Sequence, residues 1–168
     1  MIKITIIGPS GSGKSTLAKQ LGDFYEVPVI HLDSLYFNPN WQEIGKTALL
    51  EKVTPLIHST QHWIIEGNYS ITWPIRFNNS DTIIFLDFSR FVYIRRILKR
   101  SFIYHGKVRP DMADGCPERF NLDFLRFAWN YPTRRKETLK QLAHIPKEKI
   151  LTFHHPTELK HYLASLMN

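Results

Sequence analysis

Apolar and polar positions follow two alternating patterns along this chain. Short runs rich in β-branched residues predict five strands, at 3–7, 29–33, 63–66, 82–87 and 150–153. Between these runs, apolar positions at helical spacing predict helices, at 15–21, 42–57, 91–100, 121–142 and 157–166. Strands and helices in alternation form a parallel sheet with helices on both faces. We therefore expect one α/β domain over residues 1–168, built on a five-stranded parallel sheet.

Turn-forming residues set the expected ends of these elements. Asn40 is the expected N-cap of the helix that follows it, and Thr157 that of the last helix. Pro55 should bend or end the helix that contains it, and Pro132 should interrupt the long helix around it. Glycine, proline and charged residues dominate positions 104–119, and this composition predicts a loop.

The composition is that of an ordinary globular protein, with 43% hydrophobic and 22% charged residues. No apolar run approaches the ~20 residues that span a bilayer, which argues against a membrane protein. Residues 1–7 lead directly into a strand pattern, without the regions of a signal peptide. The single cysteine, Cys116, excludes an intrachain disulfide. We expect a cytoplasmic protein, and the sequence leaves its oligomeric state open.

Positive charge is concentrated in one part of the chain. The formal net charge is +7, and residues 90–140 alone hold 13 Lys/Arg against 5 Asp/Glu. Such a segment suits a polyphosphate ligand, a nucleic acid backbone or a solvated helical face. The sequence carries no zinc finger, helix-turn-helix or RNA-binding motif, so no motif supports nucleic acid as a partner.

Residues 8–15 match the phosphate-binding pattern G-x-x-x-x-G-K-[ST] between a predicted strand and a predicted helix. Glycines let such a loop (a P-loop) curl until its N–H groups point at phosphate oxygens, and the helix N-terminus adds positive charge. The motif's lysine reaches the β- and γ-phosphates, and its serine ligates Mg²⁺. The alternative is a glycine turn that binds nothing. We expect ATP (with GTP still open) and Mg²⁺ at Gly8, Pro9, Ser10, Gly11, Ser12, Gly13, Lys14, Ser15 and Thr16.

Three carboxylates end predicted strands, at the sheet edge where ligands bind in open α/β folds. Glu66 could hold a water on Mg²⁺, or it could face solvent. Asp33 could orient an acceptor hydroxyl as a base, or it could cap the following turn. Asp87 has the weaker claim, because Phe88-Ser89 resembles a simple strand-to-helix turn.

Arginines and aromatic residues extend the predicted site. Guanidinium groups beside a P-loop neutralise phosphate charge, although each one alone is more often a surface residue. We interpret residues 101–135 as an arginine-rich lid and residues 34–58 as an acceptor-binding segment. The arginines in question are Arg96, Arg100, Arg109, Arg119, Arg134 and Arg135. Aromatic residues that could stack on an acceptor ring, or simply fill the core, are Tyr36, Phe37, Trp41, Tyr69 and Trp73.

With these motifs in place, the chain resembles the adenylate-kinase-like P-loop kinases. More closely, it is similar to the bacterial family of DNA topology modulation proteins, over nearly its whole length. The segments that carry the resemblance are the P-loop, 29–33, 63–69, 81–87 and 109–119, of which the last, RPDMADGCPER, is the most specific. The family name implies an effect on DNA, which we expect to be indirect or weak.

The adenylate kinase pattern implies roles at matching positions. Arg96 and Arg100 would lie near the adenine and the phosphates, and His155 would lie in a loop that passes the base. The chain departs from the pattern after Glu66-Gly67, where those kinases place an arginine that grips the acceptor's phosphate and Arg76 is the nearest one here. This departure weakens the case for a nucleoside monophosphate acceptor. It leaves room for a hydroxyl acceptor, as in shikimate- or gluconate-type kinases.

The sequence thus predicts a kinase that moves the γ-phosphoryl of ATP to a small nucleotide, nucleoside or hydroxyl metabolite. Asp33 would orient the acceptor, while Lys14, Arg100 and either Arg134 or Arg135 would stabilise phosphate charge. Ser15 would hold Mg²⁺ directly, and Glu66 through water. The alternative function is a nucleotide-switched protein that binds nucleic acid.

Overall fold

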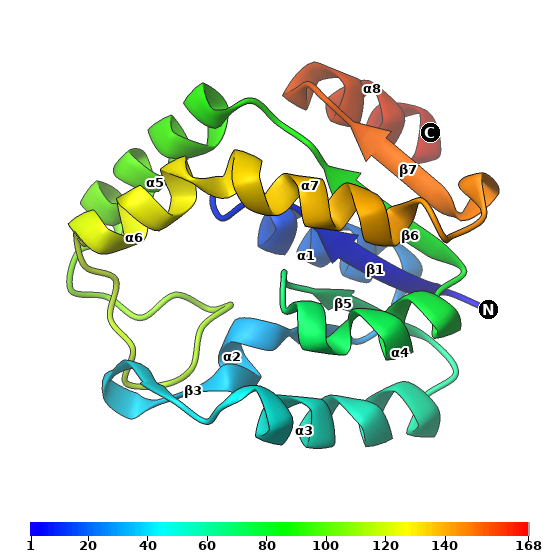
Figure 1. The fold of residues 1–168 in the computed structure, drawn as a ribbon, viewed down its shortest axis with the longest axis horizontal. Helices are drawn as coiled ribbons and strands as arrows, with labels where there is room; N and C mark the ends of the chain where they lie inside the picture. Colours follow the sequence, from blue (N-terminus) through cyan, green and yellow to red (C-terminus); the bar gives the residue numbers. More distant parts are fainter. Residues whose placement is uncertain (168) are drawn as a thin grey trace.

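Five parallel strands form the central sheet of the computed structural model, which describes residues 1–167 (Figure 1). Their order across the sheet is β2-β5-β1-β6-β7. The register pairs Thr5 with Ile65 on one side and with Ile83 on the other. The strands are β1 Lys3–Ile7, β2 Val29–His31, β5 Trp63–Glu66, β6 Thr82–Leu86 and β7 Ile150–Phe153. The predicted five-stranded parallel sheet is confirmed.

Helices connect successive strands, and a small antiparallel hairpin lies outside the sheet. The hairpin consists of β3 Phe37–Asn38 and β4 Gln42–Glu43, joined by a 3-10 turn at Pro39–Trp41. Further 3-10 turns lie at Ser70–Thr72 and Lys147–Lys149. The α-helices are α1 Lys14–Tyr25, α2 Leu32–Tyr36, α3 Lys46–Ser59, α4 Trp73–Asn79, α5 Arg90–Ile103, α6 Leu122–Trp129, α7 Tyr131–Leu142 and α8 Pro156–Met167.

Alternate residues of the strands bury both faces of the sheet. On one face, Ile6 and Ile84 pack with Leu17 of α1 and with α8. On the other face, α3 packs on β5, and α4 and α7 pack on β6. Because both faces are covered, the strand ends are the places left for a ligand. Within residues 1–167, no helix has both the length and the apolar composition that crossing a bilayer requires.

Several predicted element boundaries are wrong, for identifiable reasons. Asn40 does not cap a helix: it lies in the hairpin turn with φ of 63°, and α3 begins only at Lys46. Pro55 does not end α3, because the buried face of the helix continues to Ile57 and packing overrides the lost hydrogen bond. By contrast, the interruption predicted near Pro132 is present, because residues 121–142 form two helices, α6 and α7, which meet at Asn130.

The start of the last helix also differs from the prediction, and a short helix was not predicted at all. Thr157 is not the residue before the last helix, which begins at Pro156. The Glu158 carboxylate instead accepts hydrogen bonds from the N–H groups of His154 and His155, at 2.7 and 3.2 Å. The sequence patterns also missed α4 entirely, since its 7 residues are too few to show a helical period.

The connection between α5 and α6 (residues 104–121) crosses the open end of the molecule to reach the β3–β4 hairpin (Figure 1). Asn40 donates its backbone N–H to Gly115 O at 2.9 Å, and the Trp41 indole donates to Pro117 O at 3.2 Å. The thiol of Cys116 is buried and lies 3.2 Å from Asn38 O. These contacts place the predicted lid loop against the predicted acceptor-binding segment.

Candidate active site

A cavity of about 1000 Å³ opens at the carboxyl edge of the sheet, between the loop after β1, the β3–β4 hairpin and the α5–α6 connection. Residues 10–16 of the P-loop line it directly. Gly8 and Pro9 do not line the cavity but shape the loop, as Ser12 N donates to Pro9 O at 3.1 Å. Gly11 has φ of 80°, and a Cβ there would lie 2.6 Å from Tyr93 O, so only glycine fits.

The ammonium group of Lys14 lies folded over the loop at the start of α1. Its Nζ donates to Pro9 O at 3.0 Å. Burial lowers the pKa of Lys14, while the nearby carboxylates Glu66 and Asp33 act to raise it. The Lys14 ammonium is thus largely desolvated and lies beside the N–H groups of a helix N-terminus. It could exchange its contact with Pro9 O for contacts with phosphate oxygens.

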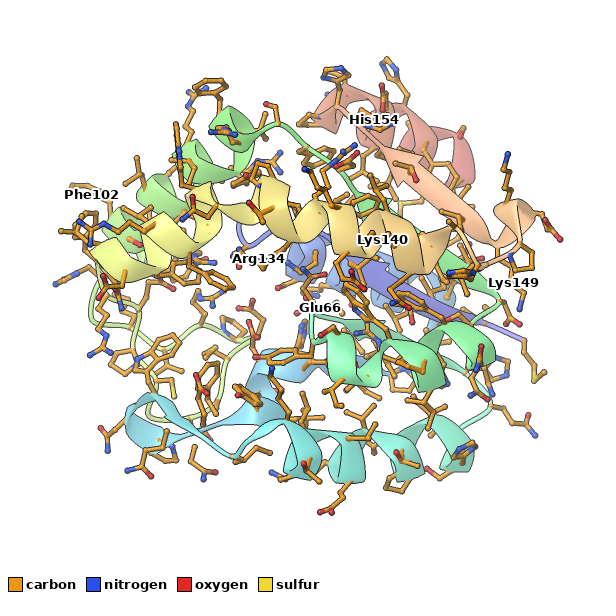
Figure 2. The ribbon with its side chains drawn as sticks, viewed as in Figure 1. Glu66, Phe102, Arg134, Lys140, Lys149 and His154 are labelled. Atoms are coloured by element: carbon orange, nitrogen blue, oxygen red, sulfur yellow. The ribbon has the colours of Figure 1, made fainter. Side chains whose placement is uncertain are left out.

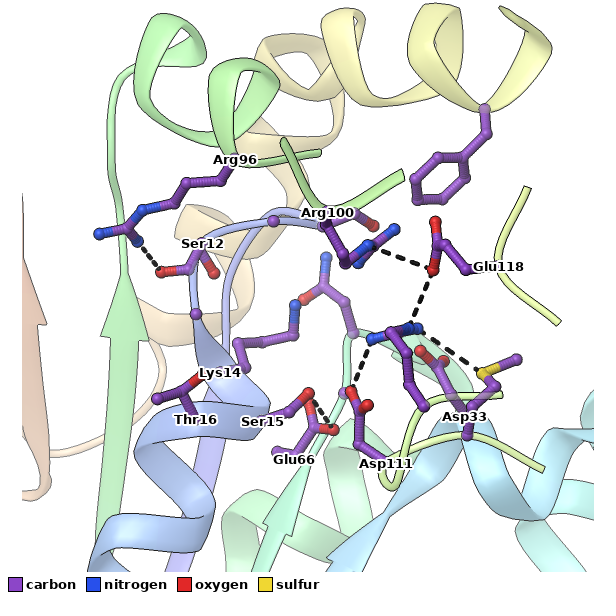
Figure 3. A pocket seen from close by; sticks show the side chains of 18 of the residues that line it. Ser12, Lys14, Ser15, Thr16, Asp33, Glu66, Arg96, Arg100, Asp111 and Glu118 are labelled. Carbon is purple, nitrogen blue, oxygen red and sulfur yellow. Dashed lines mark hydrogen bonds and ion pairs between the residues drawn. The ribbon is translucent and has the colours of Figure 1, made fainter. Parts of the chain in front are cut away.

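Glu66 lies at the end of β5, next to the loop, and is buried. The Ser15 hydroxyl donates to Glu66 Oε1 at 3.1 Å, and His31 Nδ1 lies 2.9 Å from the same oxygen (Figure 3). The carboxylate therefore faces the cavity, and not the solvent. The sequence patterns did not indicate His31, whose role depends on the β2–β5 pairing that sets it beside Glu66.

A serine hydroxyl beside a carboxylate suits Mg²⁺, which prefers oxygen ligands and keeps several waters. Within the described part of the chain, no group of three or more His, Cys, Asp or Glu side chains is placed to hold a metal ion by itself. Ser15 and Glu66 as oxygen donors fit a hydrated ion that would be shared with substrate phosphates.

Asp33 lies in the first turn of α2 and lines the same cavity as the P-loop. Its Oδ1 accepts a hydrogen bond from the Tyr69 hydroxyl at 2.7 Å. Burial, and then the negative charge of Glu66, raise the pKa of Asp33 above its ordinary value. The carboxylate is thus held toward the cavity and is more basic than usual, as a group that takes a proton from a hydroxyl should be.

Residues on α5 and the α5–α6 connection form a chain of charges over the cavity (Figure 3). Arg96 donates to Ser12 O at 2.6 Å, which ties α5 to the P-loop. Glu118 is buried between two guanidinium groups, with Arg100 Nε at 3.3 Å and Arg109 Nε at 2.9 Å. Arg109 also pairs with Asp111 at 2.8 Å.

Asp111 and Glu118 are site residues that the sequence patterns missed. Burial acts to raise the pKa of Asp111, but Arg109 and Ser15 together hold that pKa below its ordinary value. Both acids lie in the segment that we interpret as a lid, so the segment could be found from sequence. Their partners outside the segment, Ser15 on α1 and Arg100 on α5, could not.

The predicted arginines of α7 point in different directions. Arg134 lines the cavity, with its guanidinium 3.6 Å from the centre of the Phe127 ring (Figure 2). Arg135 instead binds Asp87 through two hydrogen bonds of 2.6 Å each, and His154 joins the same carboxylate at 3.2 Å. Arg135 and His155 are not among the residues that line the cavity.

Arg76, the arginine nearest to Glu66-Gly67 in sequence, is fully buried on α4. Its guanidinium donates to Gly67 O at 2.9 Å and to Ile65 O at 3.2 Å. Burial lowers the pKa of Arg76 to about 9, so it stays charged at neutral pH. This cation supports the end of β5 from beneath and does not enter the cavity.

Aromatic side chains from α2, the β3–β4 hairpin and the loop after β5 form one wall of the cavity. Tyr36, Phe37, Trp41 and Tyr69 all line it, with the Tyr36 and Tyr69 rings 4.7 Å apart and those of Phe37 and Trp41 5.4 Å apart. Trp73 does not join them: it stacks on Phe77 inside the core. Four of the five predicted aromatic residues therefore meet at one site.

Comparisons with solved structures agree with this architecture. The chain has the fold of the P-loop small-molecule kinases. A shikimate kinase from Bacteroides thetaiotaomicron matches with a TM-score of 0.60 and 17% identity, over 98% of this chain and 96% of that one. A deoxyadenosine kinase from M. mycoides matches with a TM-score of 0.56 and 17% identity, over 99% and 97%. A gluconokinase from Sinorhizobium meliloti 1021 matches with a TM-score of 0.54 and 14% identity, over 99% and 87%.

No protein-family model and no curated protein matches the chain. The resemblance to the DNA topology modulation proteins is therefore not confirmed, whereas the kinase-like fold is. Neither the fold nor these similarities support nucleic acid binding as the function of the chain.

Proposed function

We propose that this protein is an ATP-dependent kinase that transfers the γ-phosphoryl group to a small acceptor. The observation that carries the proposal is that Lys14 and Asp33 line the same cavity, close enough for each charge to shift the pKa of the other. A P-loop alone binds a phosphate. A basic carboxylate in the same cavity adds a means of orienting an attacking hydroxyl.

The P-loop side of the cavity is built to bind the triphosphate. Backbone N–H groups of the loop and the N-terminus of α1 would donate to the β- and γ-phosphates, and Lys14 would leave Pro9 O to join them. Arg96 fixes the loop through Ser12 O, which limits the reorganisation needed on binding. Arg100 and Arg134 would neutralise phosphate charge from above.

Ser15 and Glu66 would hold Mg²⁺, the first directly and the second through water. The ion would supply charge neutralisation between the β- and γ-phosphates. In the structure the two side chains bond to each other, so ion binding requires the Ser15 hydroxyl to turn away from Glu66. His31 holds the Glu66 carboxylate in place during this exchange.

Asp33 would accept the proton of the acceptor hydroxyl. The acceptor oxygen forms a bond to the γ-phosphorus, the bond from that phosphorus to the β–γ bridging oxygen breaks, and ADP leaves. The Tyr69 hydroxyl keeps the Asp33 carboxylate turned toward the acceptor. Positioning and electrostatic stabilisation, which these residues supply, account for most of catalysis in phosphoryl transfer.

Acceptor-stimulated ATP consumption tests the proposal. The assay would use the wild-type chain with ATP and Mg²⁺ against nucleosides, nucleoside monophosphates, sugars and hydroxy acids. We expect at least one acceptor class to raise turnover clearly above the rate with water alone. ATP binding without stimulation by any class would contradict a kinase function.

A further inference from the structure

Carboxylates outnumber guanidinium groups in the acceptor part of the cavity. Six cationic side chains line it, and four of them come from the P-loop, α5 and α7 on the nucleotide side, namely Lys14, Arg96, Arg100 and Arg134. Six acidic side chains also line it, and four come from α2, the hairpin and the α5–α6 connection on the acceptor side, namely Asp33, Glu43, Asp111 and Glu118. Two of these carboxylates are already paired, Glu118 with Arg100 and Arg109 and Asp111 with Arg109, so a negatively charged acceptor would chiefly meet Asp33 and Glu43.

The remaining two cationic side chains do not reverse this balance. Arg109 is paired with both Asp111 and Glu118, at 2.8 and 2.9 Å, so its charge is already compensated. Arg119 is exposed at the rim of the cavity. Away from a helix N-terminus, a bound phosphate or carboxylate is best held by guanidinium groups that donate to it in pairs.

Arg76 is a further arginine that could bind an anionic acceptor, but its guanidinium is buried outside the cavity. Its donors are committed to Ile65 O and Gly67 O on the core side of β5, and the side chain is fully buried. Reaching the cavity would require it to abandon two buried carbonyls, which leaves both acceptors unpaired away from water. No rearrangement of Arg76 therefore supplies the missing cation.

The acceptor wall instead offers flat apolar surface. Tyr36, Phe37, Trp41 and Tyr69 line it together with Met112, and the Tyr36 hydroxyl is fixed by Glu43 at 2.8 Å. Such a wall stacks on a planar ring. Asp33 lies beside this wall, and its carboxylate accepts a hydrogen bond from the Tyr69 hydroxyl.

From this arrangement we infer that the acceptor is an uncharged alcohol with a planar ring, of the nucleoside type, and that nucleoside monophosphates and hydroxy acids are excluded. The inference rests on the proposed kinase function, because it names the substrate class of the same site. A nucleoside presents a ring to the aromatic wall and a hydroxyl to Asp33. Its 5′-monophosphate brings additional negative charge beside Asp33 and Glu43, neither of which is among the ion-paired carboxylates of the described residues.

Equilibrium binding tests the inference apart from turnover. Calorimetry would titrate the four common deoxynucleosides and their 5′-monophosphates into the wild-type chain saturated with Mg²⁺ and a non-hydrolysable ATP analogue. We expect at least one nucleoside to bind, and to bind at least tenfold more tightly than its own monophosphate. A monophosphate that binds as tightly as its nucleoside overturns the inference, and so does a lack of binding by every nucleoside.

A pair of charge-reversal variants locates the effect. Glu43→Lys changes the acceptor wall, whereas Glu51→Lys makes the same change on an exposed residue of α3 that does not line the cavity. We expect E43K to reduce the preference for the uncharged nucleoside at least threefold and E51K to leave it unchanged. If E43K and E51K changed the preference for the nucleoside over its monophosphate equally, the proposed role of the acceptor wall would be wrong.

The two proposals can fail separately. Tight nucleoside binding without transfer of phosphate to it would refute the kinase function while the binding preference stands. Phosphorylation of monophosphates or hydroxy acids in preference to nucleosides would uphold the kinase function and refute the inferred acceptor class.

Discussion

Replacing Asp33 by asparagine should make the protein more stable and catalytically poor. Burial and the charge of Glu66 raise the pKa of Asp33, so the folded protein binds this proton more tightly than the unfolded chain. The charged carboxylate therefore costs stability at neutral pH, and the cost disappears as the pH falls through the folded pKa toward the unfolded value of 3.8. Asparagine removes the charge and keeps an oxygen that can accept from Tyr69.

The size of the effect follows from what is lost and gained. D33N loses its attraction to Lys14 and Arg109, and the bond from the Tyr69 hydroxyl becomes a neutral one, weaker by about 1 kcal/mol. D33N also removes a half-buried negative charge that is repelled by Glu66, and this removal stabilises the folded state. Substitutions of this kind at functional sites typically raise the free energy of unfolding by about 1 kcal/mol. For a chain of this length that corresponds to a Tm rise of about 3 °C.

Thermal unfolding and acceptor turnover measure the two halves of the prediction. At pH 7 we expect a higher Tm for D33N than for wild type, a difference that shrinks as the pH approaches the unfolded pKa, and a kcat lower by roughly 10²–10⁴-fold. Asp33→Ala is the control, since it leaves the Tyr69 hydroxyl without this partner and should gain less stability. A lower Tm for D33N at pH 7, or an unchanged kcat, would refute the reasoning.

Three further substitutions test other parts of the structure. Gly11→Ala puts a Cβ against the Tyr93 carbonyl and should weaken ATP binding at least tenfold, measured by calorimetry; unchanged affinity would contradict this geometry of the loop. Arg76→Met leaves buried carbonyls without donors and should cost about 2–4 kcal/mol in denaturant unfolding, a loss that would be absent if the guanidinium were dispensable. Asp87→Asn breaks the pair with Arg135 and should cost about 1 kcal/mol of unfolding free energy while kcat stays at the wild-type value; a large fall in kcat would place Arg135 in catalysis.

The sheet was predictable from sequence because its three central strands, β5, β1 and β6, are short runs with both faces buried. Such runs differ from helices in length and in β-branched content, so local pattern decides them. The helix ends were harder to predict. Pro55 lies inside α3 because residues far away in sequence bury its apolar face, and no local rule contains that information.

The site was predictable where its chemistry is local. Lys14 and Ser15 belong to one motif, and Glu66 could be placed because strand ends meet at one edge of a parallel sheet. Two features depended on contacts distant in sequence. The local sequence around Arg134 and Arg135 does not indicate that Arg135 pairs with Asp87. Nor does the sequence around Arg76 indicate that its guanidinium binds the end of β5 from the core side.

The transfer of labelled phosphate is the most direct test of the central claim. Wild type, Lys14→Ala and Lys19→Ala would each be incubated with γ-labelled ATP, Mg²⁺ and a nucleoside panel, and the phosphorylated acceptor measured. Lys19 is a matched control, because it lies on the same helix but is exposed and paired with Asp23. We predict labelled product with wild type and K19A, and at least a hundredfold less with folded K14A. Equal product from all three proteins, or none from any of them, would contradict the account.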